Sequence, residues 1–264
     1  MNYPILEGKR GLIFGALDEN SIAWQVALSA GKAGAIFTLS NTPAAIRLGN
    51  ATELSRLTNS ALLAGDATQV EDLRNILIKS VTHLGGRLDF ILHAIGMSPN
   101  VRKKKAYTQL DYSFYAKTMD VSALSFHKLL QTCWELDALA PNASVIALTH
   151  IAAQRVFPGY GDMSDAKAAL ESITRNFGYY YGKRNGVRVN TVSQSATKTT
   201  AGQGIEDFDK FFQYSEEMSP LGNADAASCA DFCVMMFSDY TRHVTMQNIY
   251  HDGGFSQMGL NPNI

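Results

Sequence analysis

Three consecutive segments within residues 143–193 decide the fold: ASVIALTH (143–150), THIAAQRVFPGYGDMSDAK (149–167) and GVRVNTVS (186–193). The first and the last are short apolar runs of strand length. Between them the chain passes the loop breakers Pro158 and Gly159 and enters a helical pattern that continues to about Tyr181. A strand, a helix and a second strand in this order predict a right-handed crossover between parallel strands.

The same alternation is repeated along the rest of the chain. Further strands are expected at RGLIFG (10–15), GAIFTLS (34–40), ALLAGDA (61–67), LDFILHAIG (88–96) and QNIYHDGG (247–254). Helical patterns begin near Ser21, run from Pro43 to about Leu57 and from Val70 to His83, and extend with interruptions from Leu110 to Leu139. The pattern predicts an α/β fold with a doubly wound, parallel, seven-stranded sheet covered by helices on both faces.

No linker, charge block or internal repeat divides the chain, so residues 1–264 are expected to form a single domain. The segments Tyr107–Thr118 and Ala196–Met218 go beyond the alternation of strands and helices. Segments of this kind often shape substrate pockets.

The composition is that of a globular protein, with 46% hydrophobic and 18% charged residues. A net charge of −1 argues against a general nucleic-acid binder. The N-terminal residues lack the apolar core of a signal peptide, and no run is long enough to span a membrane. Cys133, Cys229 and Cys233 suggest neither a disulfide framework nor a zinc site, so we expect no metal and a reducing, cytoplasmic location.

Tyr160 and Lys167 are seven positions apart, which places both side chains on one face of the expected helix. A phenol and an ammonium on one face suit acid catalysis, because the cation would stabilise the phenolate and lower the pKa of the phenol. The spacing alone does not distinguish this interpretation from a structural one, in which the tyrosine only packs and the lysine only contributes to solubility.

Ligands of an open α/β sheet bind beyond the carboxyl ends of its strands. Gly15, followed by a helix that starts near Ser21, could place backbone N–H groups against a pyrophosphate, although a plain strand–loop–helix explains the pattern equally well. Asp66 either accepts a hydrogen bond from an adenine amino group or caps the following helix.

The chain resembles the enoyl-[acyl-carrier-protein] reductases (NADH), a divergent branch of the short-chain dehydrogenase/reductase family, in the form found in Bacteroidetes-like bacteria. The resemblance rests on GKRGLIFGALDENSIAW (8–24), GDAT (65–68), HAIGMSPN (93–100), GVRVNTVSQ (186–194), TTAGQG (199–204) and HDGGFS (251–256). The larger branch spaces its Tyr and Lys four apart, but the residue four before Lys167 is Met163. The resemblance implies a Rossmann-type fold and reduction of the trans-2 double bond of enoyl thioesters in the last step of type II fatty-acid elongation.

In the implied mechanism, hydride adds to the β-carbon and Tyr160 stabilises the enolate. The implied catalytic residues are Tyr160, Lys167 and His150. The implied cofactor-binding residues are Gly15, Ser21, Ile22, Ser40, Asp66, Ala67, Ala94, Ile95, Gly96, Lys167, Thr197 and Thr199. The implied substrate-binding residues are Met97, His150, Tyr160, Met163, Ala201 and Phe208, and residues 196–218 would form a mobile substrate-binding segment.

The chain also departs from the family pattern. His150 stands where the family usually has a second tyrosine; it could donate a hydrogen bond to the carbonyl and, if protonated, titrate near neutral pH. Ala196 replaces a common proline, which could loosen that loop. Glu206, Asp207 and Asp209 stand where relatives often carry basic residues, which puts docking of an acidic carrier protein there in doubt.

Two features leave alternatives open. The second strand ends at Ser40 and Asn41 without the acidic residue that reads a ribose diol and excludes a 2′-phosphate, so NADPH is possible. NADH is expected from the resemblance alone. The run Arg102–Lys105 is either a solvated loop or a patch that steers an acidic carrier protein or a phosphopantetheine phosphate.

The expected partners are acyl carrier protein and further copies of the chain in a homotetramer, with no nucleic acid and no membrane. The alternative function is an NAD(P)-binding paralogue with an altered substrate or little turnover because of His150. Retention of Tyr160 and Lys167 argues against that alternative.

Overall fold

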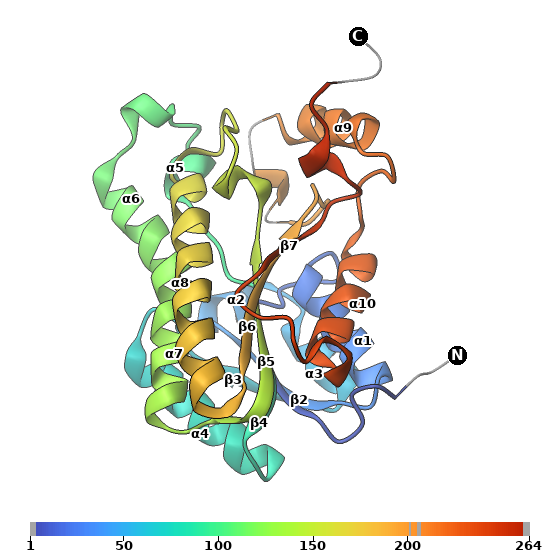
Figure 1. Cartoon of the computed structure of the whole chain (residues 1–264). Coiled ribbons are helices and arrows are strands. Elements are labelled where there is room, and N and C mark those ends of the chain that lie inside the picture. Colours follow the sequence, from blue (N-terminus) through green and yellow to red (C-terminus); the bar gives the residue numbers. More distant parts are fainter. Residues whose placement is uncertain (1–3, 201, 205–206, 261–264) are drawn as a thin grey trace.

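The computed structural model describes residues 4–200, 202–204 and 207–260. A single parallel sheet of seven strands, in the order β3-β2-β1-β4-β5-β6-β7, runs through the molecule (Figure 1). The strands are β1 (Arg10–Phe14), β2 (Ile36–Asn41), β3 (Ala61–Ala64), β4 (Leu88–His93), β5 (Leu139–Thr149), β6 (Arg188–Gln194) and β7 (Asn248–His251). The predicted fold class is confirmed.

The helices cover both faces of this sheet. They are α1 (Ile22–Lys32), α2 (Pro43–Leu48), α3 (Ala51–Thr58), α4 (Val70–Leu84), α5 (Pro99–Arg102), α6 (Tyr112–Met119), α7 (Ser125–Glu135), α8 (Gly161–Asn185), α9 (Phe208–Met218) and α10 (Ala226–Phe237). A π-helical turn, η2 (Asp120–Leu124), joins α6 to α7. None of the described helices is long and apolar enough to cross a membrane.

Alternating side chains of the strands build two separate cores. In β1, Ile13 joins a buried cluster with residues of α1 and α10, whereas Leu12 and Phe14 join a second cluster with residues of α4, α7 and α8. Figure 1 shows α1 and α10 on one face of the sheet and α7 and α8 on the other. Near-continuous apolar strands are needed here because both faces are covered.

Two of the differences from the expected element boundaries have a clear structural cause. The helix expected from Pro43 to about Leu57 is interrupted at Gly49 and Asn50. A Cβ atom on Gly49 would lie 2.4 Å from the carbonyl oxygen of Leu17, so this close approach requires a glycine. The fifth strand begins at Leu139 rather than near residue 143, because Leu139 pairs with Leu88 before a register shift in β4.

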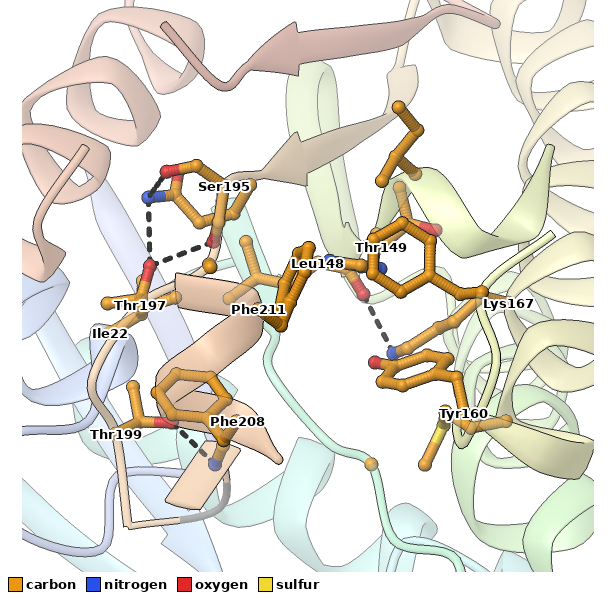
Figure 2. A pocket seen from close by; sticks show the side chains of 18 of the residues that line it. Ile22, Leu148, Thr149, Tyr160, Lys167, Ser195, Thr197, Thr199, Phe208 and Phe211 are labelled. Carbon is orange, nitrogen blue, oxygen red and sulfur yellow. Dashed lines mark hydrogen bonds between the residues drawn. The ribbon is translucent and has the colours of Figure 1, made fainter. Parts of the chain in front are cut away.

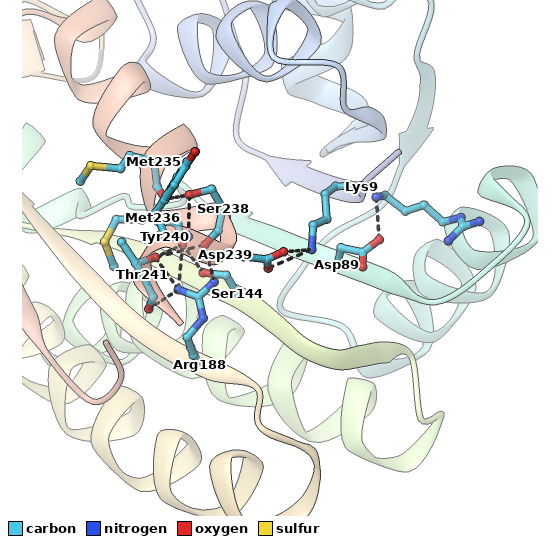
Figure 3. Close-up of polar contacts among 11 residues, drawn as sticks. Lys9, Asp89, Ser144, Arg188, Met235, Met236, Ser238, Asp239, Tyr240 and Thr241 are labelled. Atoms are coloured by element: carbon cyan, nitrogen blue, oxygen red, sulfur yellow. Dashed lines mark hydrogen bonds and ion pairs between the residues drawn. The ribbon is translucent and has the colours of Figure 1, made fainter. Parts of the chain in front are cut away.

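A buried arginine ties the sheet to α10 (Figure 3). Arg188, at the start of β6, donates from Nη1 to the carbonyl oxygens of Met236 and Thr241, each at 3.0 Å, and from Nη2 to that of Ser238 at 3.1 Å. Burial lowers the pKa of this guanidinium. Met236 lies in the last turn of α10 and Ser238 is its C-cap, so one side chain satisfies two acceptors at the helix end and a third in the turn that follows.

The strand order determines where the ligand crevice lies. β1 lies between β2 and β4, so the chain winds away in opposite directions on its two sides. In doubly wound sheets the ligand lies at such a switch point, beyond the carboxyl ends of the strands.

Candidate active site

A cavity of about 970 Å³ opens at the carboxyl ends of β1, β4, β5 and β6. Most of the residues predicted for the site line it: Gly15, Ser21, Ile22, Ala94, Ile95, Gly96, Met97, His150, Tyr160, Met163, Lys167, Thr197, Thr199 and Phe208. Figure 2 shows how segments far apart in the sequence bring Ile22, Tyr160, Lys167, Thr199 and Phe208 to this one space.

One end of the cavity has the form of a phosphate cradle. Gly15 has a φ of +96°, and a Cβ atom there would lie 2.1 Å from the carbonyl oxygen of Ala94, so only glycine fits. Ser21 precedes α1 but donates its hydroxyl to the carbonyl oxygen of Asp18 at 2.7 Å instead of capping the helix. The first turn of α1 carries no acidic side chain. An uncapped helix N-terminus beside a close-packed glycine fits the pyrophosphate of a dinucleotide.

The loop after β4 is held by a side chain from the π-helical turn η2. The Oγ atom of Ser122 accepts from the backbone N–H of Met97 at 3.0 Å and donates to the Met97 carbonyl oxygen at 3.1 Å. This double contact fixes the path of Gly96 past the cavity. A Cβ atom on Gly96 would lie 3.6 Å from Nζ of Lys167, an ordinary contact distance, so this part of the loop passes directly beside the ammonium.

Tyr160 is the N-cap residue of α8 and therefore lies just outside the helix in which it was expected. Its ring still lies beside the Lys167 side chain (Figure 2). The expectation that Lys167 lowers the pKa of Tyr160 is wrong: burial raises that pKa to about 12. The phenol is therefore a neutral hydrogen-bond donor at physiological pH.

Lys167 is 7% exposed and donates from Nζ to the carbonyl oxygen of Leu148 at 2.9 Å. Burial lowers its pKa to about 8, and the nearby carboxylate of Glu171 opposes that shift. Glu171 in turn accepts from the Thr149 hydroxyl at 3.1 Å and from the Gln154 amide at 2.9 Å. The ammonium is thus fixed by the end of β5 and retains donors for the cavity.

His150 follows β5, and its ring packs among aromatic side chains. The ring centroids of Phe157, Tyr160 and Phe211 lie 5.3, 5.0 and 6.0 Å from that of His150. Burial, followed by the charge of Lys167, lowers the pKa of His150 to about 4. The expected titration near neutral pH is therefore wrong, and the imidazole is neutral.

Three predicted cofactor residues do not line the cavity. Asp66 accepts from the backbone N–H and the hydroxyl of Thr68, at 2.9 and 2.8 Å, so its Oδ1 stabilises the local turn. Ala67 packs in the core with Leu73, and Ser40 is buried within β2. The predicted substrate residue Ala201, like Glu206, lies outside the described residues.

Two lining residues lie within strand-end segments expected from the sequence but were assigned no individual role. Asn41, the residue after Ser40, lines the cavity and donates from Nδ2 to the carbonyl oxygen of Ala16 at 3.0 Å. Asp18 accepts from the Thr200 hydroxyl at 2.5 Å and so links the loop after β1 to the loop after β6. The proximity of Asn41 to the end of the second strand was the available signal.

Comparison with known proteins identifies a matching family and relatives over nearly the whole chain. A family model described as Enoyl-(Acyl carrier protein) reductase matches residues 15–256. The chain is 32% identical over 258 residues to Enoyl-[acyl-carrier-protein] reductase [NADH] 2 of Rhizobium meliloti (strain 1021), covering 96% of this chain and 93% of that protein.

Solved structures show the same similarity. The FabI–NADH complex from Alistipes finegoldii superposes with a TM-score of 0.97 at 54% identity, covering 98% of this chain and 92% of the other. Enoyl-[acyl-carrier-protein] reductase (NADH) from Aquifex aeolicus VF5 superposes with a TM-score of 0.89 at 29% identity, covering 97% and 99% of the two chains.

Proposed function

The chain belongs to the enoyl-(acyl carrier protein) reductase family, and from that premise we propose how its residues carry out the reduction. The protein is an NADH-dependent oxidoreductase that reduces enoyl thioesters of acyl carrier protein, the last step of type II fatty-acid elongation. The observation that carries the mechanism is the single cavity in which Tyr160 and Lys167 lie beside the cradle formed by Gly15 and α1.

NADH, when bound, supplies the hydride that adds to the β-carbon of the trans-2-enoyl thioester. Lys167 binds the hydroxyl groups of the ribose next to the nicotinamide, because its ammonium donates once to Leu148 and has two further N–H groups. Gly15, Ser21 and Ile22 hold the pyrophosphate. Asn41, rather than Ser40, contacts the cofactor at the end of β2, because Asn41 lines the cavity and Ser40 does not.

Tyr160 donates a hydrogen bond to the thioester carbonyl oxygen and stabilises the negative charge that develops there. A pKa raised to about 12 keeps the proton on the phenol, so the donor is already in place when the enolate forms. Preorganised donors of this kind contribute the largest electrostatic part of catalysis in many enzymes.

His150 is a second donor to the same oxygen. Its Nδ1 atom accepts from the backbone N–H of Ala152 at 3.2 Å, so the proton of the neutral ring resides on Nε2. A neutral imidazole with Nε2–H can replace the hydroxyl of the tyrosine that the family usually has at this position. The replacement therefore preserves the hydrogen bond without adding a charge.

Residues 196–218 form the substrate-binding segment. Phe208 and Phe211 of α9 line the cavity, and Phe211 packs edge-on against Phe157 with centroids 4.5 Å apart. Met163 adds a flexible apolar surface from α8. This aromatic and aliphatic wall suits the hydrocarbon part of an acyl chain.

We further propose that four copies assemble in the cytoplasm. Support for assembly comes from Tyr179 and Tyr180 on α8, which are 53% and 60% exposed, an unusual exposure for adjacent aromatic rings on one helix. Support for the location comes from Cys133, Cys229 and Cys233, which are all buried and free. Light scattering of the purified protein measures the mass of the assembly.

The test of the function is NADH oxidation in the presence and absence of an enoyl thioester, followed by absorbance. Oxidation that depends on the thioester supports the reductase. Binding of NADH without thioester-dependent oxidation would favour the alternative, a nucleotide-binding paralogue in which His150 has abolished turnover.

A further inference from the structure

The two walls of the cavity mouth carry opposite charges. On one wall, α5 is followed at once by a basic turn, which we define as Arg102, Lys103, Lys104 and Lys105, all of them exposed. On the other wall, α9 and its N-cap carry the acidic residues Asp207, Asp209, Glu216 and Glu217 and one lysine, Lys210, which pairs with Asp207 at 3.0 Å. Arg102 and Lys210 both line the cavity.

Helix α5 and helix α9 lie at the same end of the molecule, beyond the carboxyl ends of the strands (Figure 1). A negatively charged partner that approaches this end is attracted by the basic turn and repelled by most of α9.

The basic turn has a defined backbone structure. The N–H of Lys105 bonds to the carbonyl oxygen of Asn100, and the N–H of Lys104 bonds to that of Val101, each at 3.0 Å. These two bonds form a Schellman motif, in which Lys104 takes the left-handed position with a φ of +54°. Glycine or asparagine normally occupies that position, so this chain keeps a lysine where the backbone favours another residue.

The turn is also fixed relative to the active site. Ser98 and Asn100 donate to the two carboxylate oxygens of Asp162, at 2.6 and 2.8 Å, and Asp162 lies in the first turn of α8, two residues after Tyr160. Asn100 and Asp111 exchange two further hydrogen bonds, at 3.0 and 3.1 Å. The buried Asp162 network therefore fixes the start of α5, which leads into the basic turn, relative to the first turn of α8.

We propose that the basic turn is the docking surface for the acidic carrier protein, and that the carrier enters over α5 rather than over α9. This inference rests on the proposed function, because it concerns the delivery of the same substrate. The thioester is joined to its carrier through a phosphodiester-containing arm, and Arg102, at the cavity rim, is placed to meet that phosphate. Lys103, Lys104 and Lys105 lie farther along the turn and contact the carrier itself.

The test compares three enoyl thioesters of the same acyl length: one on acyl carrier protein, one on coenzyme A and one on N-acetylcysteamine. The first has both carrier and phosphate, the second only phosphates and the third neither. The variant combines Lys103→Gln, Lys104→Gly and Lys105→Gln; Lys104→Gly also removes the unfavourable left-handed lysine, so the variant should fold. The matched control combines Lys32→Gln, Lys79→Gln and Lys183→Gln, which removes three exposed lysines that do not line the cavity.

The proposal predicts that the triple variant raises KM for the carrier-bound substrate on the order of tenfold. Its kcat, and its KM for the N-acetylcysteamine thioester, should match the wild type. The wild-type KM for the carrier-bound substrate should rise toward that of the variant as salt is added, because salt screens exposed charges.

Four results would overturn the proposal. Two of them concern KM for the carrier-bound substrate: a value within twofold of the wild type in the triple variant, and an equal rise in the control variant. An equal rise with coenzyme A would show a phosphate site without protein docking. An equal rise with all three thioesters would show damage to the cavity. If no thioester is reduced even by the wild type, the proposed function itself fails.

Discussion

The rings of His150 and Tyr160 lie with their centroids 5.0 Å apart and their planes inclined by 34°. One ring follows strand β5 and the other precedes helix α8, so the fold brings two polar aromatic side chains to one side of the cavity. Burial shifts the pKa of each in the direction that keeps it neutral, toward about 4 for His150 and about 12 for Tyr160. Two neutral donors can therefore share one developing oxyanion across a wide range of pH.

His150→Tyr should retain at least half of the wild-type kcat, because a phenol hydroxyl replaces the Nε2–H donor. His150→Phe keeps an aromatic ring but has no donor, and kcat should fall about 10- to 100-fold. Steady-state kinetics with one thioester measures both. Equal activity of the phenylalanine variant and the wild type would show that the imidazole only packs against its neighbours.

The pH dependence of turnover follows from the same shift. A histidine whose pKa is lowered to about 4 is neutral throughout the range from pH 5.5 to 7.5. Substitution of His150 by tyrosine should therefore leave the shape of the kcat profile unchanged over that range. An inflection near pH 6.5 in the wild type that disappears in the tyrosine variant would contradict the neutral imidazole.

Lys167 gives the affinity for NADH its own pH dependence. Burial lowers its pKa from 10.5 to about 8, so the ammonium is present below pH 8 and is lost above it. The Kd for NADH, measured by fluorescence, should rise between pH 7.5 and 9.5. The lysine keeps its proton up to a higher pH in the unfolded chain than in the folded protein. The free energy of unfolding should therefore rise with pH over the same interval.

Two variants separate this effect from general damage. Lys167→Arg keeps its charge, so its Kd for NADH should stay flat over the interval. Lys183→Gln changes an exposed lysine on the same helix and should behave as the wild type. A flat wild-type profile would show that Lys167 does not bind the cofactor through its charge.

Gly15→Ala should destabilise the protein by about 2 kcal/mol or more and weaken NADH binding, because the new Cβ atom meets the Ala94 carbonyl oxygen. Gly85→Ala is the matched control: Gly85 also has a positive φ, of +69°, but nothing lies within 4 Å of its Cβ position. The control variant should lose about 1 kcal/mol of folding stability and bind NADH as the wild type does. Denaturant unfolding and NADH titration distinguish the two, and equal losses would remove the special role of the Gly15 contact.

Sequence periodicity predicts the sheet well because each strand is a short apolar run between helical patterns. It does not predict where a helix breaks when the cause is distant, as at Gly49, whose contact is the backbone of Leu17. The spacing of Tyr160 and Lys167 predicts one shared helix face, whereas Tyr160 lies at the N-cap of α8; both side chains nevertheless line one cavity.

The charge states of the site residues could not be predicted from the sequence, because they depend on burial in the folded protein. Whether a cation lowers the pKa of Tyr160 depends on competition between attraction and burial, and burial dominates here. The walls that bury His150 include Phe211, which is 61 positions away in the chain. Asp66 follows a strand as a ligand-binding residue would, but Thr68 already occupies its Oδ1 atom.

The most direct test of the mechanism is single-turnover oxidation of bound NADH by a saturating enoyl thioester, in the wild type and in Tyr160→Phe. Removal of the proposed oxyanion donor should slow the hydride step about 100- to 1,000-fold, while the Kd for NADH stays within twofold of the wild type. A hydride step in Tyr160→Phe that is as fast as in the wild type would contradict the assignment of Tyr160 as the group that stabilises the enolate.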